Sequence, residues 1–316
     1  MKKLIILILV LFASADIFSA PVMKIFSGDV TVKSPGSSDW KKPFSGMTLN
    51  DGYQIKTGRA AYAAIDLGGD EIRISQNSLV EITTDMVDDQ PSGFLSLFVG
   101  RLSLKMDKLK KNNQNYGIRT PTAVAAIRGT EFDIAAGADG TTLVQVKEGT
   151  VSLTGVKNTV MIGPDQESSV KIGKDPEKVK TFKPREWDAW LAESEKNLKG
   201  NELKFMKMLL ENAKRLDSEI AGMEKQQAVL SAEAVNFKNK AEEFKKADDD
   251  VNWEVNMRIS RDRLRKASLF GKKSSYQASR IDFMKKNAER IYLETGKPES
   301  MLAVYKKIEN IHSKYY

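Results

Sequence analysis

The sequence predicts an all-β domain of roll or solenoid-like form over residues 22–175, followed by an α-helical coiled-coil hairpin arm over residues 184–316. Two observations predict this division. Before residue 175, short alternating runs of branched apolar and hydroxyl residues lie between glycine-rich turns, which is typical of strands. After residue 184, glycine becomes rare while alanine, glutamate, lysine and leucine dominate, which is typical of helices.

The first fifteen residues have the three parts of a secretory signal. Lys2 and Lys3 precede an apolar run over residues 4–12, and Ala13-Ser14-Ala15 provides small residues at the cleavage positions. We therefore expect cleavage after Ala15 and a periplasmic address. No later apolar run approaches the roughly 20 residues that a membrane-spanning helix needs.

Composition argues against most site chemistries. The chain has no cysteine and its one histidine is His312, so a thiolate site, a His-based triad and a multi-histidine metal centre are not expected. No pair of carboxylates stands out as general acid and base. We expect a non-enzymatic protein without a cofactor.

One short phrase occurs three times in the β-region, as GDVTV at 28–32, GRLSL at 100–104 and GTVSL at 149–153. Period-two alternation places its two apolar residues on one face and the hydroxyl on the other. The preceding glycine fits a bulge or a tight corner. Further strands are expected near residues 53–56, 61–67, 71–75, 79–83, 143–147, 151–153, 160–162 and 169–172.

The β-region is organised around RTPTAVAAIRGTEFDI, residues 119–134. Pro121 holds Thr120 extended, and we expect a turn or bulge at Arg128-Gly129 before the strand restarts as TEFDI. An ion pair between Arg128 and Glu131 would pin that corner. The signature residues are Thr120, Pro121, Arg128, Gly129, Thr130, Glu131 and Phe132.

This stretch and the strand-turn order of residues 24–173 resemble the FecR domain family. The resemblance implies an extracytoplasmic all-β module, which in the family's regulators receives a signal from an outer-membrane receptor. Those regulators also carry a sigma-factor-binding segment ahead of a membrane span. Because the expected signal peptide opens this sequence, we do not expect the sigma-factor role to carry over.

The helical region contains two seams with alternating steps of three and four residues, which predict a coiled coil. The stretches 201–247 and 251–295 are of nearly equal length, and the short turn ADDDVN between them predicts an antiparallel hairpin. An earlier set at residues 187–198 joins the first seam through a stutter next to Gly200, where we expect a bend or local unwinding. The first seam comprises Met206, Leu209, Ala213, Leu216, Ile220, Met223, Gln227, Leu230, Ala234, Phe237, Ala241 and Phe244. The second comprises Trp253, Met257, Ser260, Leu264, Ala267, Gly271, Ser274, Ala278, Ile281, Met284, Ala288 and Ile291.

Residues 258–273 hold seven basic residues against one acid. The members that share one helix face are Arg258, Arg261, Arg265 and Lys272. The functional interpretation is an anionic partner, namely an envelope protein, an envelope polymer or a membrane surface. The alternative is a solvated face balanced by acids on the opposite helix. Nucleic acid is not expected for an exported chain.

Three functions follow from these features. The first is an exported, non-enzymatic interaction or scaffold protein whose β-module and arm contact envelope partners. The second is a periplasmic sensor or regulatory component that binds a ligand or receptor and relays its state to a membrane regulator. The third, a carbohydrate enzyme, is disfavoured by the missing carboxylate pair. The sequence leaves open the partner, the ligand and whether the coiled coil forms within one chain or between chains.

Overall fold

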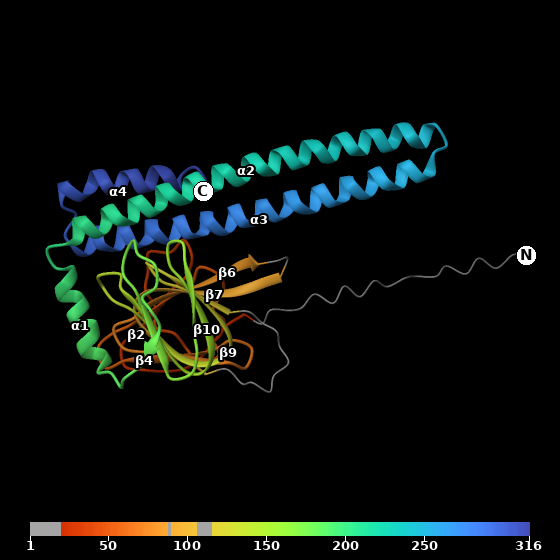
Figure 1. Ribbon diagram of the computed structural model, residues 1–316. Coiled ribbons are helices and arrows are strands. Elements are labelled where there is room, and N and C mark those ends of the chain that lie inside the picture. Colours follow the sequence, from red (N-terminus) through yellow and green to blue (C-terminus); the bar gives the residue numbers. More distant parts are fainter. Residues whose placement is uncertain (1–19, 88–89, 106–115) are drawn as a thin grey trace, which may run out of the picture.

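The computed structural model describes residues 20–87, 90–105 and 116–316, so the expected signal peptide at 1–15 lies outside the described residues. A β-rich domain comes first in the chain and four helices follow it. Two long helices lie side by side across the β-domain and project well beyond it (Figure 1). The β-rich region followed by long helices confirms the predicted order of secondary structure.

The described strands pair into one sheet. Most agree within a few residues with the expected positions, but residues 143–153 belong to one long strand instead of two. The strands are β1 (Val22–Ser27), β2 (Val30–Lys33), β3 (Gln54–Thr57), β4 (Tyr62–Asp66), β5 (Glu71–Ile74), β6 (Leu79–Val87), β7 (Gln90–Lys105), β8 (Tyr116–Arg119), β9 (Val124–Ala136), β10 (Thr142–Thr154), β11 (Thr159–Ile162), β12 (Gln166–Val170) and β13 (Lys180–Thr181).

Strand β7 is the centre of the sheet. Its first half pairs with β6 and runs parallel to β8, whereas its second half pairs with β5 and β9. The other strand pairings are antiparallel. Successive strands therefore return on one another in a bent, barrel-like sheet, and their inward apolar residues form one continuous core.

The repeated glycine phrase is a corner, as predicted. Gly28, Gly100 and Gly149 all have positive φ, at 78°, 107° and 83°. A Cβ at Gly100 would lie 2.1 Å from Ser78 Oγ, so that corner has no room for a side chain. The two apolar residues after each glycine are buried in every copy. The phrase therefore turns the chain and then directs two side chains into the core.

The helices are α1 (Trp187–Leu198), α2 (Glu202–Lys246), α3 (Asp250–Glu294) and α4 (Glu299–His312). The bend or local unwinding expected next to Gly200 is a complete break, so the first seam does not continue through residues 187–198. The chain breaks between α1 and α2 at Gly200, whose φ is 81°. Helix α1 instead packs on the β-domain, where Ser194 Oγ accepts a 2.9 Å hydrogen bond from the Ala138 amide and Arg101 lies 5.3 Å from the Trp187 ring.

Helices α2 and α3 form an antiparallel pair. Ser260 Oγ donates to the Ala234 carbonyl at 2.8 Å, and Gly271 faces Gln227, whose Nε2 would lie 3.0 Å from a Cβ at that glycine. The first seam is buried or half-buried along its whole length. In the second seam Leu264 is an exception, since it is 51% exposed. Its neighbour Arg263 instead reaches across to Glu233 at 3.0 Å.

Helix α4 packs against both long helices near the β-domain. Its apolar residues Met301, Val304 and Ile308 join the core between α2 and α3. The end of the chain is fixed to α2, because Lys314 Nζ and Tyr315 Oη both donate to Asp217 at 2.6 Å. The inner part of the helix pair is therefore a small helical bundle, and the outer part is an arm of two helices.

Candidate functional site

A cleft of about 660 Å³ lies between part of the β-domain and the helices. Its β-domain wall comes from β2, β3 and the segment between them, and includes Lys33, Trp40 and Lys56. Its floor includes Phe98 and Val99 of β7. Its helical wall is formed by Glu195 of α1 and by Lys286, Glu289, Arg290, Leu293 and Glu294 of α3.

The β-domain wall presents an aromatic ring with two cations. The ring of Trp40 is partly exposed, and Lys33 Nζ and Lys56 Nζ lie 5.2 and 6.0 Å from its centroid. The position of this segment is fixed by the bridge between Lys41 and Val32. Contacts of this kind are worth about 0.5–1 kcal/mol each at exposed sites. The wall therefore offers a flat apolar surface next to positive charge.

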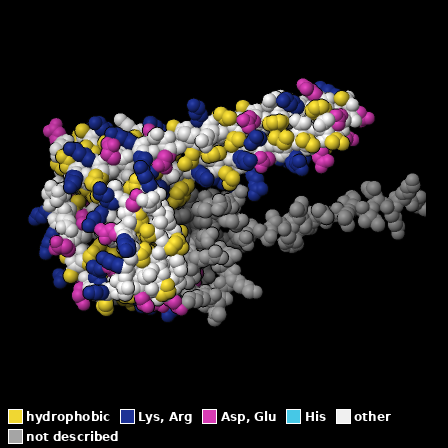
Figure 2. All heavy atoms as spheres, viewed as in Figure 1, with side chains coloured by type: hydrophobic (Ala, Val, Ile, Leu, Met, Phe, Trp, Pro, Cys, Tyr) yellow, Lys and Arg dark blue, Asp and Glu magenta, His cyan; other side chains and the backbone are white. Residues whose placement is uncertain are grey.

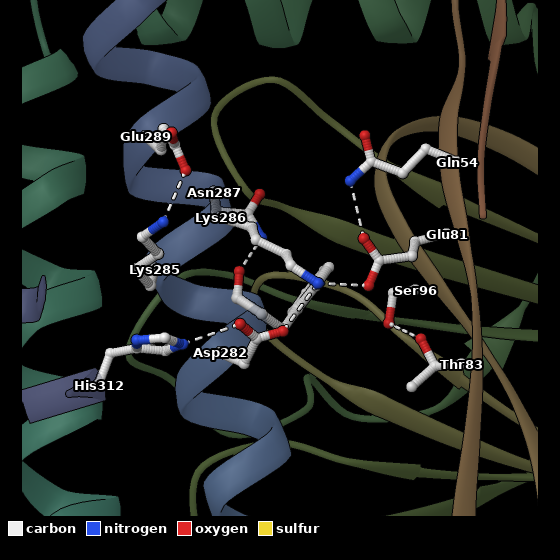
Figure 3. A network of polar contacts seen from close by, with 11 residues as sticks. Gln54, Glu81, Thr83, Ser96, Asp282, Lys285, Lys286, Asn287, Glu289 and His312 are labelled. Carbon is white, nitrogen blue, oxygen red and sulfur yellow. Dashed lines mark hydrogen bonds and ion pairs between the residues drawn. The ribbon is translucent and has the colours of Figure 1, made fainter. Parts of the chain in front are cut away.

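The helical wall is joined to the β-domain by a polar network (Figure 3). Lys286 Nζ lies 2.6 Å from Glu81 Oε1 of β6 and 2.8 Å from Asp282 Oδ2. The other oxygen of Glu81 accepts a 2.7 Å hydrogen bond from Gln54 Nε2 of β3. The second oxygen of Asp282 lies 3.0 Å from Nε2 of His312 in α4. One chain of contacts thus connects β3, β6, α3 and α4.

The network holds Lys286 in its charged form. Burial of Lys286 opposes the charge, but Glu81 and Asp282 together outweigh this effect and raise the lysine pKa above 10.5. Glu81 is itself almost fully buried, with 7% of its side chain exposed. Burying a carboxylate without a charged partner costs free energy, so the ion pair with Lys286 stabilises the arrangement in which α3 covers Glu81.

Aromatic contacts lie beside this network. The rings of Phe98 and Phe283 are both buried, with centroids 4.6 Å apart and planes tilted by 53°. Further along α3, the guanidinium carbon of Arg119, which is also buried, lies 4.9 Å from the ring of Tyr276. Helix α3 is therefore fixed to the outer face of the sheet by ionic, aromatic and cation–π contacts.

The structure places the signature residues in the β-domain core and not in the cleft. Thr120 and Thr122 hydroxyls each lie within hydrogen-bonding distance of Thr142 Oγ1, at 2.5 and 2.7 Å. Pro121, Thr130 and Phe132 are buried. Glu131 lies 3.6 Å from Lys105 and 3.9 Å from Lys147. The side chain of Arg128, and with it the expected pair between Arg128 and Glu131, lies outside the described part of the structure.

The expected turn at Arg128-Gly129 is wrong, whereas the bulge is correct. Strand β9 runs unbroken from Val124 to Ala136. Its register with β10 shifts between Val146 and Glu148, and shifts back between Glu148 and Thr150. Two compensating bulges therefore keep both strands in the sheet. In the second bulge, Gly129 and Thr130 of β9 lie opposite the single residue Gly149 of β10.

The basic face is where the sequence placed it, along α3, and lies away from the cleft. Arg258, Arg261 and Arg265 are exposed and have no ion pair with any described residue. Lys272 is half-buried. Two neighbouring cations behave differently, since Arg263 pairs with Glu233 and Lys266 pairs with Asp262 at 2.9 Å.

Sequence reasoning missed the cleft itself. Glu81 alternates with the buried residues Val80 and Ile82, a pattern that is typical of a strand residue facing solvent. Phe98 follows the inward Leu97 and likewise faces outward. The sequence carries one indication that another element covers this face, namely the large apolar residue Phe98 on the outer face of β7, next to Glu81 of β6.

The described residues lack two kinds of feature. No helix among them is long and apolar enough to cross a membrane. Within the same residues there is no group of three or more histidine, aspartate or glutamate side chains arranged to hold a metal ion.

Comparison with known proteins identifies the β-domain. Its barrel-like sheet defines the class, an all-β module with a helical extension. The family model described as FecR protein matches residues 53–152, which lie within the β-domain. No curated protein matches.

Solved structures with a similar chain course include two crystal structures of a candidate anti-sigma factor from Parabacteroides distasonis, at 1.65 and 2.50 Å resolution. Each has 16% identity and a TM-score of 0.36, and covers 44% of this chain. The match spans 64% and 63% of those chains, which is less than two thirds of their length.

Proposed function

We propose that this protein is an exported sensor or regulatory component, in which the FecR domain receives a ligand or partner and the helices relay its state. Support comes from the FecR match at residues 53–152 and from the regulatory role of that family. The basic, apolar and small-residue pattern of residues 1–15 supports a periplasmic address. We further propose that the protein is not an enzyme and that it acts through protein or envelope partners.

The observation that carries the proposal is the double role of α3. Lys286 lies in the wall of the cleft and also forms the buried contact with Glu81 that fixes α3 to the sheet. A ligand that contacts Lys286 or Glu289 would change the balance of charge on α3 at that contact. A site can shift an equilibrium only through such differential contacts. Occupancy of the cleft would in this way alter how the helix pair sits on the β-domain.

In this proposal the chain has two units, residues 22–175 and 184–316. The α2–α3 pair is a coiled coil that forms within one chain. The helix pair then extends the reach of the β-domain toward a second protein. This retains the interaction role of the arm that the sequence suggested and makes it the output side of a sensor.

A transcript experiment in the native host tests the regulatory role. The gene is deleted, and the strain is complemented with the native chain, with Lys286→Met, with Trp40→Ala or with the control Met161→Ala, whose side chain is exposed on β11. We expect a defined set of transcripts to change on deletion, to be restored by the native chain and the control, and to stay altered with the two cleft variants. A deletion strain with an unchanged transcript profile would contradict the regulatory function.

A further inference from the structure

Helix α3 carries a second stripe of residues besides the seam that faces α2. The stripe follows the same alternating spacing of three and four, so its members lie on one face of the helix. In the inner half of α3 this face meets the β-domain through Tyr276 and Phe283, which contact Arg119 and Phe98. In the outer half the same face continues as Val251, Val255, Arg258, Asp262, Arg265 and Leu269.

The outer half of the stripe is uncovered. Val251 is 74% exposed, and Val255 and Leu269 are also exposed. Between them lie Arg258 and Arg265, one heptad apart, and neither forms an ion pair with a described residue, although the charges of Asp262 and Arg265 interact. The acid of the stripe, Asp262, is already paired with Lys266. Exposed aliphatic side chains therefore flank two arginines that form no ion pair with a described residue.

The shape of the molecule decides between possible partners. Because the inner half of the stripe packs on the β-domain, the outer half faces the concave side of the angle between the arm and that domain (Figure 1). Hydrophobic, basic and acidic side chains are interleaved along the projecting arm in the space-filling view (Figure 2). A flat bilayer would meet the β-domain before lying along the stripe. A narrow partner such as a single helix would not meet that obstacle.

We propose that the outer stripe of α3 binds an acidic, amphipathic helix of a partner protein. Exposed valine and leucine would pack against the apolar face of that helix, as in other helix-to-groove complexes. Arg258 and Arg265, with Arg261 beside them, would pair with its carboxylates and favour an acidic helix over a neutral or basic one. The inference extends the proposed function by giving the chemistry of the arm's partner, and it can be tested without any ligand in the cleft.

A binding experiment uses the full mature chain and a synthetic probe. The probe is a helical peptide of about 20 residues with leucines at alternating steps of three and four and glutamates beside them. A second peptide has lysine in place of each glutamate, and a third probe is a phosphatidylglycerol vesicle. We expect the acidic peptide to bind, the basic peptide to bind at least tenfold more weakly, and the difference to shrink as salt is raised. Equal binding of the two peptides, or binding to vesicles alone, would overturn the proposal.

Charge reversal locates the binding surface. Arg258→Glu with Arg265→Glu is expected to lose about tenfold in affinity for the acidic peptide. The matched control is Lys225→Glu with Lys238→Glu, which makes the same charge change at exposed positions of α2 and should bind as the native chain does. Equal loss in both double variants would mean that only the net charge of the arm matters. Helical circular dichroism confirms that each variant remains folded.

Crosslinking in the native host identifies the physiological partner. A benzophenone amino acid replaces Val255 in the full chain, and Val235, an exposed residue of α2, serves as the control position. We expect a crosslink from position 255 to a segment whose sequence is acidic and helical, lost when Arg258 and Arg265 are reversed. A crosslink to lipid, to a basic or neutral segment, or to no molecule at all would refute the assignment.

Discussion

Replacing Lys286 by methionine removes the cation that connects α3 to the sheet while keeping a side chain of similar length. The native lysine is 31% exposed and its partner Glu81 only 7% exposed. After the substitution Glu81 keeps a single described hydrogen-bond donor, the amide of Gln54. Breaking a buried pair from one side typically costs about 3–5 kcal/mol. Because this lysine is partly exposed, we expect the lower end, about 3 kcal/mol.

A double-mutant cycle shows whether the loss comes from this pair. Glu81→Gln removes the carboxylate that Lys286→Met leaves unpaired, so the double variant should lose less than the two single losses combined. Residues in direct contact usually have coupling energies of about 0.5–3 kcal/mol. The assay is urea unfolding followed by far-ultraviolet circular dichroism and by tryptophan fluorescence.

Lys285→Met is the matched control for this cycle. Lys285 is the preceding residue of α3 and pairs with Glu289 at 2.9 Å within the same helix. Pairs of this kind contribute about 0.3–0.5 kcal/mol. We therefore expect Lys285→Met to cost several times less than Lys286→Met. Equal losses, or additive effects of Glu81→Gln and Lys286→Met, would refute the argument that the buried pair holds α3 on the sheet.

Four further predictions follow from the junction and the helices. Phe283→Ala should destabilise the chain by about 3 kcal/mol, because it leaves a cavity beside Phe98, as measured by urea unfolding. Burial opposes the charge of Asp217, but hydrogen bonds from Lys314 and Tyr315 outweigh it and lower the pKa below 3.8. The stabilisation that Asp217 gives to the end of the chain is thus present above pH 3.8 and is lost as the pH falls through the folded-state pKa, which amide exchange of α4 against pH would detect. Leu230→Asp should melt the outer arm and leave the β-sheet intact, since burial of a leucine contributes on the order of 2 kcal/mol, as judged by exchange in each region. Cysteines at Phe244 and Trp253 should form a disulfide within one chain on a non-reducing gel, whereas crosslinks found only in dimers would show that the arm joins two chains.

Features that a regular spacing of residues defines were predicted correctly from the sequence. The boundaries of α2 and α3 were predicted within one or two residues, because a long seam and a short polar turn define them almost completely. The three glycine corners were also predictable, since each glycine precedes two inward apolar residues. The FecR resemblance rested on the order of these short strands and turns.

The features that depend on packing between distant segments were not predictable. Arg128-Gly129 suggested a turn, but pairing with β10 keeps the strand continuous through two compensating bulges. The spacing of Leu264 fitted the seam, but its side chain is exposed. At this position along the two helices, the contact between α3 and α2 is the ion pair of Arg263 with Glu233. The cleft was missed because its walls come from residues about 200 positions apart, such as Leu79 and Lys286, and no sequence spacing indicates that such distant residues meet.

Hydrogen exchange along α3 tests most directly whether the β-domain and the helices act as one coupled unit. In the native chain, amides of residues 276–290, which lie on the β-domain, should exchange far more slowly than those of residues 251–272 in the arm. Glu81→Gln, a change made only in the β-domain, should accelerate exchange in residues 276–290 by about tenfold or more and leave residues 251–272 unchanged. Uniform exchange along α3, or exchange in residues 276–290 that does not respond to Glu81→Gln, would contradict the coupling.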